Sequence, residues 1–339
     1  MLSTIRRLVR TYTESKALVL LYHRVAEPES DIWDLAVTPA RFEQQLRFLQ
    51  KTGLVISAEE LVAQLAKRTL KRRSVVITFD DGYVDNFLAA RPLLAHYQLP
   101  ATFFVASGNV GSAQEFWWDE LEHLCLFAER LPPICSLAVA GCHLAVELGA
   151  EQLLSPALRQ RHLSWKVCHE VPPTKRAALF YQLWQLLKPL PYSEQQQQLR
   201  LLRAWAGASM VIRPAYHSLS PAQLRELSSN QLFTIGAHTV THPALASHSA
   251  SLQAQELRAG QQALSQITGR LPALAAYPYG NYDEKTMAVA AGLALTAAFT
   301  TEARAVTNES QQYQLGRFQV GNWAGDEFYQ RLDNWFAAG

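Results

Sequence analysis

Short apolar runs along the chain alternate with longer segments in which apolar residues recur every three or four positions. The continuous apolar runs, which favour buried strands, include ALVLLYH, SVVITFD, ATFFVAS, FTIGAH, ALAAYPYG and LTAAFTT. The segments between them have helical spacing, as in TPARFEQQLRFLQKTG, FLAARPLLAHYQ, LSPAQLRELSSNQ, SLQAQELRAGQQALSQITG and EKTMAVAAGL. Near-continuous apolar strands that alternate with helices predict a parallel sheet covered by helices on its outside.

The helix predicted at 38–53 has clear signals at both ends. Thr38 is a capping residue, Pro39 suits the first helical position, and Gly53 is typical of a helix end.

The alternation stops between about 112 and 215. This segment holds all four cysteines and patterns that are mostly helical, such as TKRAALFYQLWQLLK. We therefore predict one domain over 1–339, with a core of about 16–111 and 216–330 and a helical insertion at 112–215. The aromatic group EFWWDELEHL at its start would either belong to a core or stack on sugar rings.

The composition is that of an ordinary globular protein and argues against two classes. Of 339 residues, 49% are hydrophobic and 18% are charged, and the formal net charge is +2. Because no lysine and arginine block is longer than KRR, nucleic acid is not expected as a partner. No run approaches the roughly eighteen apolar residues of a membrane-spanning helix.

The N-terminus has two interpretations. Residues 1–13 combine apolar positions at helical spacing with three arginines, which would suit a helix lying on an anionic membrane. A helix that covers the end of the core is the alternative. The apolar run that follows is too short for an export signal, so we expect a cytoplasmic protein, with the inner membrane surface left open.

The cysteines lack the spacing of a disulfide framework or a C-x-x-C motif, which favours reduced thiols. A zinc site built from Cys142, His143, Cys168 and His169 is an alternative that the sequence leaves open.

Two adjacent acids end the run VVITFDDG. Functional groups gather at the carboxyl ends of parallel strands, where Asp80 and Asp81 are expected, and Gly82 allows a sharp turn after them. Neighbouring side chains on a pleated strand point in different directions, so the two acids need not share one role. The alternative is that Asp81 or Asp85 caps the next helix.

A pair of histidines ends another strand, in FTIGAHTVTHP. His238 and His242 are four positions apart, and two imidazoles with one carboxylate form a common metal site that leaves positions open for water and substrate. A metal site is therefore a stronger interpretation than two packed histidines.

TFDDGY, HTVTH and YPYG, in this order, resemble the successive motifs of the polysaccharide deacetylases, the fourth family of carbohydrate esterases, also known as the NodB homology domain. The similarity includes LLYHRV near the start and FTTE followed by LGRFQV near the end. It implies an α/β fold, a distorted (β/α)7 barrel, that removes acetyl groups from N-acetylated sugars with one divalent metal ion.

The resemblance implies a role for each matching residue. Asp81, His238 and His242 would hold the metal, and Asp80 would be the general base on a metal-bound water. The backbone N–H of Tyr279 would help to stabilise the oxyanion of the intermediate.

The sequence departs from the common family pattern in two places. No histidine occurs after His248, so we predict that His23 replaces the usual C-terminal general acid, as in relatives with permuted motifs. Tyr277 stands where many relatives have an arginine that orients the catalytic aspartate. Arg317 or Arg24 would then take over that contact.

The predicted function is removal of an N-acetyl group from an amino sugar in a glycan or glycan precursor. Zinc is the default metal, with cobalt, nickel or manganese also compatible with the ligands. A lipid-linked or nucleotide-linked sugar would suit a cytoplasmic enzyme. The alternatives are a deformylase or other amidase on such a sugar, and a carbohydrate-binding homologue without activity. No protein partner follows from the sequence.

Overall fold

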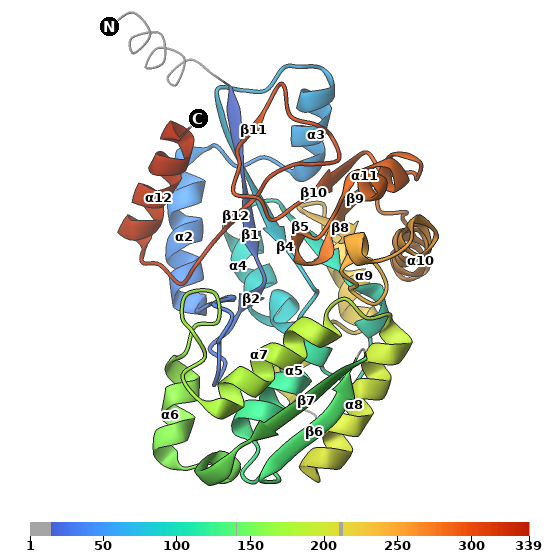
Figure 1. Cartoon of the computed structure of the whole chain (residues 1–339). Coiled ribbons are helices and arrows are strands. Elements are labelled where there is room, and N and C mark those ends of the chain that lie inside the picture. Colours follow the sequence, from blue (N-terminus) through green and yellow to red (C-terminus); the bar gives the residue numbers. More distant parts are fainter. Residues whose placement is uncertain (1–14, 140, 210–212, 339) are drawn as a thin grey trace, which may run out of the picture. The chain divides into compact units, whose positions relative to one another are not determined.

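The computed structural model describes residues 15–139, 141–209 and 213–338 (Figure 1). The amphipathic segment predicted at 1–13 lies outside the described residues. Two compact units form the chain: the first comprises Met1–Glu27, Ala36–Gly111 and Ser218–Gly339, and the second comprises Pro28–Leu35 and Ser112–His217.

The first unit is built on a curled sheet whose strands are almost all parallel. Neighbouring strands follow the order β10 (Ala297–Phe299), β9 (Leu274–Ala276), β8 (Phe233–Ala237), β5 (Ala101–Val105), β4 (Arg73–Phe79) and β1 (Lys16–Tyr22), and β1 also pairs with β11 (Val306–Thr307) and β12 (Phe318–Gln319). Only β11 is antiparallel to its neighbour. Arg24–Val25 (β2) and Ala36–Val37 (β3) form a separate short parallel pair.

The segment 315–319 completes the ring of strands. Leu315 bridges Phe299 at the end of β10, and Phe318 on β12 pairs with Leu20 on β1. The sheet therefore curls into a distorted barrel, which confirms the predicted fold class.

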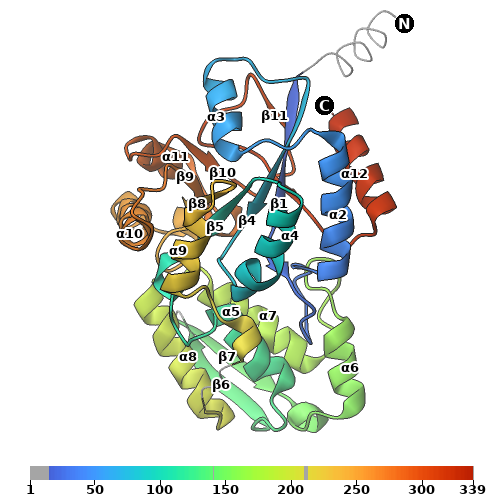
Figure 2. The same cartoon turned by 180° about the vertical axis from the view of Figure 1, so that it is seen from behind.

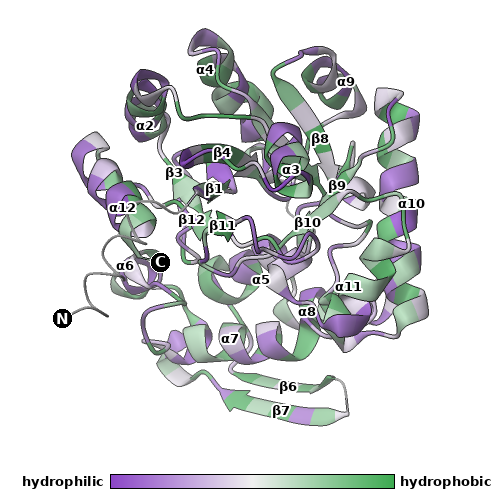
Figure 3. Cartoon of the chain, turned by 90° about the horizontal axis from the view of Figure 1, so that it is seen from above, coloured by the Kyte–Doolittle hydropathy of each residue, from purple (hydrophilic) through white to green (hydrophobic). Residues whose placement is uncertain are grey.

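Helices surround this sheet, as Figure 3 shows from above. They are α2 (Pro39–Thr52), α4 (Arg91–His96), α9 (Pro221–Ser229), α10 (Ala250–Thr268), α11 (Glu284–Ala291) and α12 (Gly325–Ala337). The helix α3 (Ala58–Ala66) instead lies over the ring of strands and packs against residues of the barrel interior. The view from behind shows α2 beside α12 (Figure 2). The predicted limits of α2 are confirmed, since the Thr38 side chain caps it, Pro39 begins it and Gly53 ends it with φ 62°.

One predicted helix is only partly α-helical. A π-helical turn at Asn86–Ala90 precedes α4, which contains Pro92 in its first turn. Because proline has no N–H to donate to the preceding turn, regular α-helical hydrogen bonding cannot run through this point.

Alternating residues of each strand belong to two different hydrophobic clusters. The interior cluster joins Ala17, Val19 and Val76 to Leu61 and Leu65 of α3. The other cluster contains the intervening strand residues and the apolar faces of the outer helices. Because side chains alternate between the two faces, the same alternation determines which residues at the carboxyl end of each strand face the barrel interior.

The second unit contains helices and one antiparallel hairpin. Its elements are α5 (Trp117–Glu122), a π-helical turn (His123–Phe127), β6 (Ile134–Val139), β7 (Cys142–Glu147), α6 (Pro156–Ser164), α7 (Lys175–Leu187) and α8 (Tyr192–Ala206). Phe116, Trp117 and Trp118 are buried, as expected of core residues. The sequence did not predict the hairpin, whose second strand has no buried side chain.

All four cysteines are free thiols. Cys142 and Cys168 are exposed, and they do not gather with His143 and His169, so the alternative zinc site is not formed. None of the helices in the described ranges is both long and apolar enough to cross a membrane.

Candidate active site

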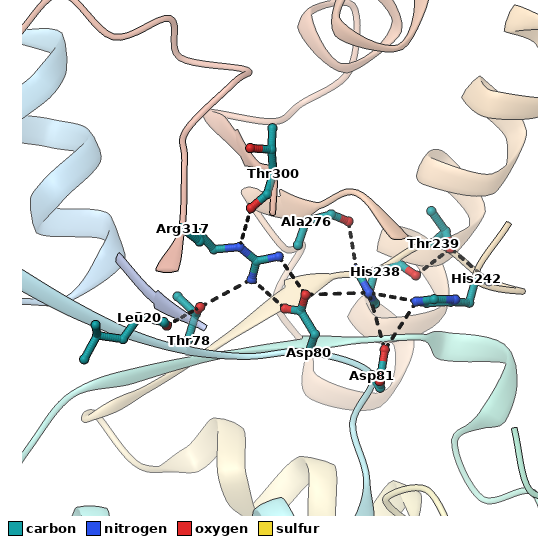
Figure 4. A network of polar contacts seen from close by, with 10 residues as sticks. All are labelled: Leu20, Thr78, Asp80, Asp81, His238, Thr239, His242, Ala276, Thr300 and Arg317. Carbon is teal, nitrogen blue, oxygen red and sulfur yellow. Dashed lines mark hydrogen bonds and ion pairs between the residues drawn. The ribbon is translucent and has the colours of Figure 1, made fainter. Parts of the chain in front are cut away.

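Two strand ends bring the predicted acids and histidines together. Asp80 and Asp81 follow β4, and His238 follows β8, at the carboxyl edge of the same sheet. Figure 4 shows their side chains converging, with His242 returning to them after a short loop. Asp80, Asp81, His238 and His242 are all buried.

Asp80 is held by a bidentate ion pair with Arg317. The two terminal guanidinium nitrogens donate to the carboxylate oxygens at 2.7 and 2.6 Å (Figure 4). Arg317 also donates to the carbonyl of Thr300 at 2.8 Å and to the hydroxyl of Thr78 at 3.3 Å. The arginine is fully buried, so its orientation is fixed from several sides.

Asp81 faces the two histidines instead. Its Oδ1 lies 3.5 Å from Nε2 of His238 and 3.3 Å from Nε2 of His242. The two imidazole nitrogens are 3.1 Å apart. Asp81, His238 and His242 each offer one donor atom, and these atoms lie within 4.8 Å of one another. Within the described residues, this is the one group of at least three His, Cys, Asp or Glu side chains with that spacing.

This donor set fits a divalent metal ion. Nδ1 of His238 donates to the carbonyl of Ala276 at 2.8 Å, so in the neutral ring Nε2 presents its lone pair to the cluster. Two imidazole nitrogens and one carboxylate oxygen suit zinc and neighbouring transition metals.

The electrostatics of the site follow from burial and close opposite charges. Burial disfavours the charged form of Asp80, but the charge and hydrogen bonds of Arg317, together with the nearby His238, outweigh it and hold the pKa of this carboxyl below its ordinary value. Burial also opposes ionisation of Asp81, and hydrogen bonds from His238 and His242 lower its pKa nonetheless. Burial would lower the pKa of His238, yet Asp80 and Asp81 raise it, whereas burial lowers that of His242 to about 4.

Left-handed backbone is concentrated at this site. The described residues include seven non-glycine positions with positive φ, and four of them are Asp81, Thr239, His242 and Tyr279. Such conformations cost free energy for a residue with a side chain and often mark functional sites. These conformations could not be predicted from the sequence, because glycine is the residue type that routinely adopts positive φ.

His23 lies one register step beyond the last paired residues of β1 and β4. Tyr22 pairs with Phe79, and the amide of Asp80 donates to the carbonyl of Tyr22 at 3.0 Å. His23 and Asp80 are thus neighbours that continue the interior side of each strand. Nδ1 of His23 is buried and has no hydrogen-bond partner within the described residues. Burial lowers the pKa of His23, and the carboxylates of Asp81 and Asp80 act in the opposite direction.

Tyr279 reaches the site through a tight turn after β9. Its φ is 58°, and the centroid of its ring lies 4.4 Å from the centroid of the His242 ring. Gly280 follows with φ 61°, and a Cβ there would collide with the side chain of Thr301. The turn therefore requires glycine where the sequence has it.

Arg24 and Asp85 form a different ion pair, away from Asp80. Nε of Arg24 donates to Asp85 at 3.0 Å, and the same carboxylate accepts the amide hydrogen of Val25 at 3.0 Å. Asp85 does not cap the following helix, so that alternative for the acids was wrong. Tyr277 belongs to the hydrophobic cluster between the strands and the outer helices, and its hydroxyl donates to the carbonyl of Tyr313.

The structure thus brings all the predicted site residues to one edge of the barrel: His23, Asp80, Asp81, His238, His242, Tyr279 and Arg317. Of the two arginines that the sequence offered, Arg317 contacts Asp80.

Comparison with known proteins identifies a family. The model of the family described as polysaccharide deacetylase matches residues 67–125 and 196–298, which include five of these site residues but not His23 or Arg317. The poly-beta-1,6-N-acetyl-D-glucosamine N-deacetylase of Staphylococcus aureus is 31% identical over 113 residues, covering 30% of this chain and 39% of that protein. The match thus spans about two fifths of the curated relative.

Solved structures share the fold over nearly the whole chain. A deacetylase from Streptococcus pyogenes, PplD in complex with acetate, has a TM-score of 0.57 at 19% identity and covers 94% of this chain and 98% of that one. IcaB from Ammonifex degensii has a TM-score of 0.56 at 20% identity, with coverages of 96% and 98%. The family match over residues 67–125 and 196–298 is thus to the polysaccharide deacetylases, and the solved structures show that the chain shares the fold of such deacetylases.

Proposed function

We propose that this protein is a metal-dependent hydrolase that removes an N-acetyl group from an N-acetylated amino sugar. One observation carries the proposal. Of two adjacent buried carboxylates, Asp81 completes a three-residue ligand cluster, whereas Asp80 stays outside it and is oriented by Arg317. Metal binding alone has no need of the second carboxylate, but amide hydrolysis needs a base.

Asp81, His238 and His242 would hold the ion, with zinc as the default choice. When bound, such an ion lowers the pKa of water and polarises an acyl carbonyl.

Asp80 accepts the proton of the attacking water in this proposal. Arg317 keeps its carboxylate ionised and fixes its direction through two hydrogen bonds. A base held within reach of water in a buried site contributes typically 10²- to 10⁴-fold to the rate.

His23 supplies the proton that the leaving amine needs. Its position beside Asp80, on the interior side of β1, supports this role. Burial disfavours the imidazolium form, and the two nearby carboxylates favour it. The backbone N–H of Tyr279, in a turn beside His242, would donate to the developing oxyanion.

The relatives support a proposal for the substrate class. We propose an oligosaccharide that contains N-acetylglucosamine, with the β-1,6 linkage named for the Staphylococcus aureus relative as the first candidate. Lipid-linked and nucleotide-linked sugars belong in the same panel, and formylated sugars distinguish a deacetylase from a deformylase.

The test measures acetate and formate release from this panel by the zinc-loaded protein, the chelated protein and Asp80→Asn. We expect zinc-dependent acetate release that falls by about 10²- to 10⁴-fold in Asp80→Asn, with zinc stoichiometry unchanged. Zinc binding without turnover of any substrate would contradict the proposal and favour a carbohydrate-binding protein. Equal activity of the chelated protein would contradict metal dependence.

A further inference from the structure

The loop between the two histidines has an unusual backbone. Thr239 and His242 have φ values of 65° and 57°. A β-branched residue such as threonine rarely adopts this conformation, so the loop needs support from its surroundings. Part of that support is internal, since the hydroxyl of Thr239 accepts the amide hydrogen of His242 at 3.1 Å.

One carboxylate accepts three hydrogen bonds from this loop. Oε2 of Glu256, on α10, accepts the amide hydrogens of both Val240 and Thr241 at 2.9 Å. Oε1 of the same residue accepts the hydroxyl hydrogen of Thr241 at 2.8 Å. A charged acceptor that binds three donors of one loop is stronger than neutral acceptors would be.

Two glycines allow the neighbouring elements to approach this loop closely. A Cβ at Gly260, four residues after Glu256 on α10, would lie 2.8 Å from the carbonyl carbon of Thr239. On the other side, a Cβ at Gly108 would lie 2.7 Å from the carbonyl oxygen of Val240. The amide of Gly108 donates to that oxygen at 2.9 Å. The loop therefore packs closely against α10 on one side and against the segment after β5 on the other.

We propose that Glu256 is a positioning residue for the metal ligands. By fixing the two central amides of the loop, it holds the imidazoles of His238 and His242 in the convergent arrangement in which their Nε2 atoms are 3.1 Å apart. The inference rests on the proposed function, because it concerns the ligand set for the ion. It adds a residue that sequence reasoning missed, since a single glutamate on an amphipathic helix looks like part of a solvated face.

Three substitutions separate the contacts of Glu256. Glu256→Ala removes the acceptors of two amide hydrogens in a strained loop. Glu256→Gln keeps one oxygen for these amides, and its NH₂ group can donate to the hydroxyl of Thr241, so only the charge is lost. Gln255→Ala, at the exposed neighbouring position of α10, is the matched control.

The experiment titrates each full-length variant with zinc by calorimetry and records the absorption spectrum with cobalt. We expect zinc affinity to fall about 10- to 100-fold in Glu256→Ala, less than tenfold in Glu256→Gln, and not at all in Gln255→Ala. The cobalt bands of Glu256→Ala should shift because its imidazoles are reoriented. Wild-type affinity and an unchanged cobalt spectrum in Glu256→Ala would overturn the inference.

A steric variant keeps the test decisive if Glu256→Ala does not fold. Gly260→Ala raises helix propensity by about 1 kcal/mol, yet its Cβ would press on Thr239. We expect at least a tenfold loss of zinc affinity despite the better helix former, and unchanged affinity would overturn the claim that α10 positions the loop. If the wild type takes up no zinc, the proposed function itself fails, which separates that failure from the failure of this inference.

Discussion

Asp80 and Asp81 are adjacent in sequence and equally buried, yet they have different surroundings. Asp80 is 2% exposed and meets a guanidinium group that is fixed by Thr78 and Thr300. Asp81 is 3% exposed and meets two imidazoles. A fixed cation stabilises the ionised form of Asp80 permanently, whereas the imidazoles can exchange a proton for a metal ion.

The backbone explains how neighbours can serve one site. In regular strand geometry, successive side chains point to opposite faces, so Asp81 would turn away from Asp80. Asp81 instead has φ 71° and is followed by Gly82 with φ 86°. This left-handed turn returns the second carboxylate to the site, on the side of His238. Two roles thus arise from one dipeptide by a change of backbone conformation.

The largest effect should come from Asp81→Asn, set against the matched Asp80→Asn. The change at Asp81 removes the anionic ligand and leaves two neutral imidazoles, so we expect zinc affinity to fall by more than about 100-fold and acetate release to reach background. Asp80→Asn should keep zinc while it loses turnover. Zinc calorimetry on the two variants measures the contrast, and equal zinc loss in both would break the division of roles.

A smaller effect is expected from His23→Gln, which removes a proton donor beside Asp80. For amide substrates we expect kcat to fall by about 100-fold, with unchanged zinc affinity. Activated aryl acetates test the reason, because their leaving group departs without a proton. The loss should shrink to a few-fold on such esters. An equal loss on amides and activated esters would argue that His23 does not protonate the leaving group.

Arg317→Met removes the ion-pair partner of Asp80 and leaves both carboxylates in place. Without the guanidinium, burial is left to raise the pKa of Asp80, so the base becomes protonated at higher pH than in the wild type. In the wild type this pKa is below its ordinary value of about 3.9, and Asp80 stays ionised at any pH above that. The variant should lose kcat at mildly acidic pH, where the wild type keeps it, and by up to about 100-fold through misorientation.

The pH profile of kcat/KM, with zinc occupancy measured at each pH, checks this expectation. Arg317→Lys serves as the control, because it keeps a cation and should shift the acidic limb less than Arg317→Met. An acidic limb that stays in place in Arg317→Met would show that Asp80 does not set it. The unpaired buried carboxylate should also cost about 3–5 kcal/mol of unfolding free energy.

The fold could be predicted where local signals and tertiary packing agree. Thr38, Pro39 and Gly53 delimit α2 because capping depends on a few neighbouring residues. The hairpin of β6 and β7 could not be predicted, since β7 has no buried face that would impose a period of two. Apolar periodicity indicates which residues are buried, so it cannot predict a strand that has no buried face.

The candidate site could be predicted in part. The motifs gave Asp80, Asp81, His238 and His242, which lie at strand ends where parallel sheets gather functional groups. They could not decide between Arg24 and Arg317 as the partner of Asp80, because the choice depends on how strands far apart in sequence pack together. They gave no sign of Glu256, whose contacts exist only once α10 packs against the loop.

The smallest effect should come from Thr78→Val, which trims the support of Arg317 without touching either carboxylate. The hydroxyl of Thr78 donates to the carbonyl of Leu20 at 2.7 Å and accepts from Arg317 at 3.3 Å. One such hydrogen bond is worth about 1 kcal/mol, so kcat should fall by no more than about fivefold. Thr102→Val is the matched control, at the paired and equally buried position on β5. Because Thr78 supports only the Asp80 side of the site, zinc affinity should remain that of the wild type, and a parallel loss of zinc would mean that the two carboxylates act as one unit.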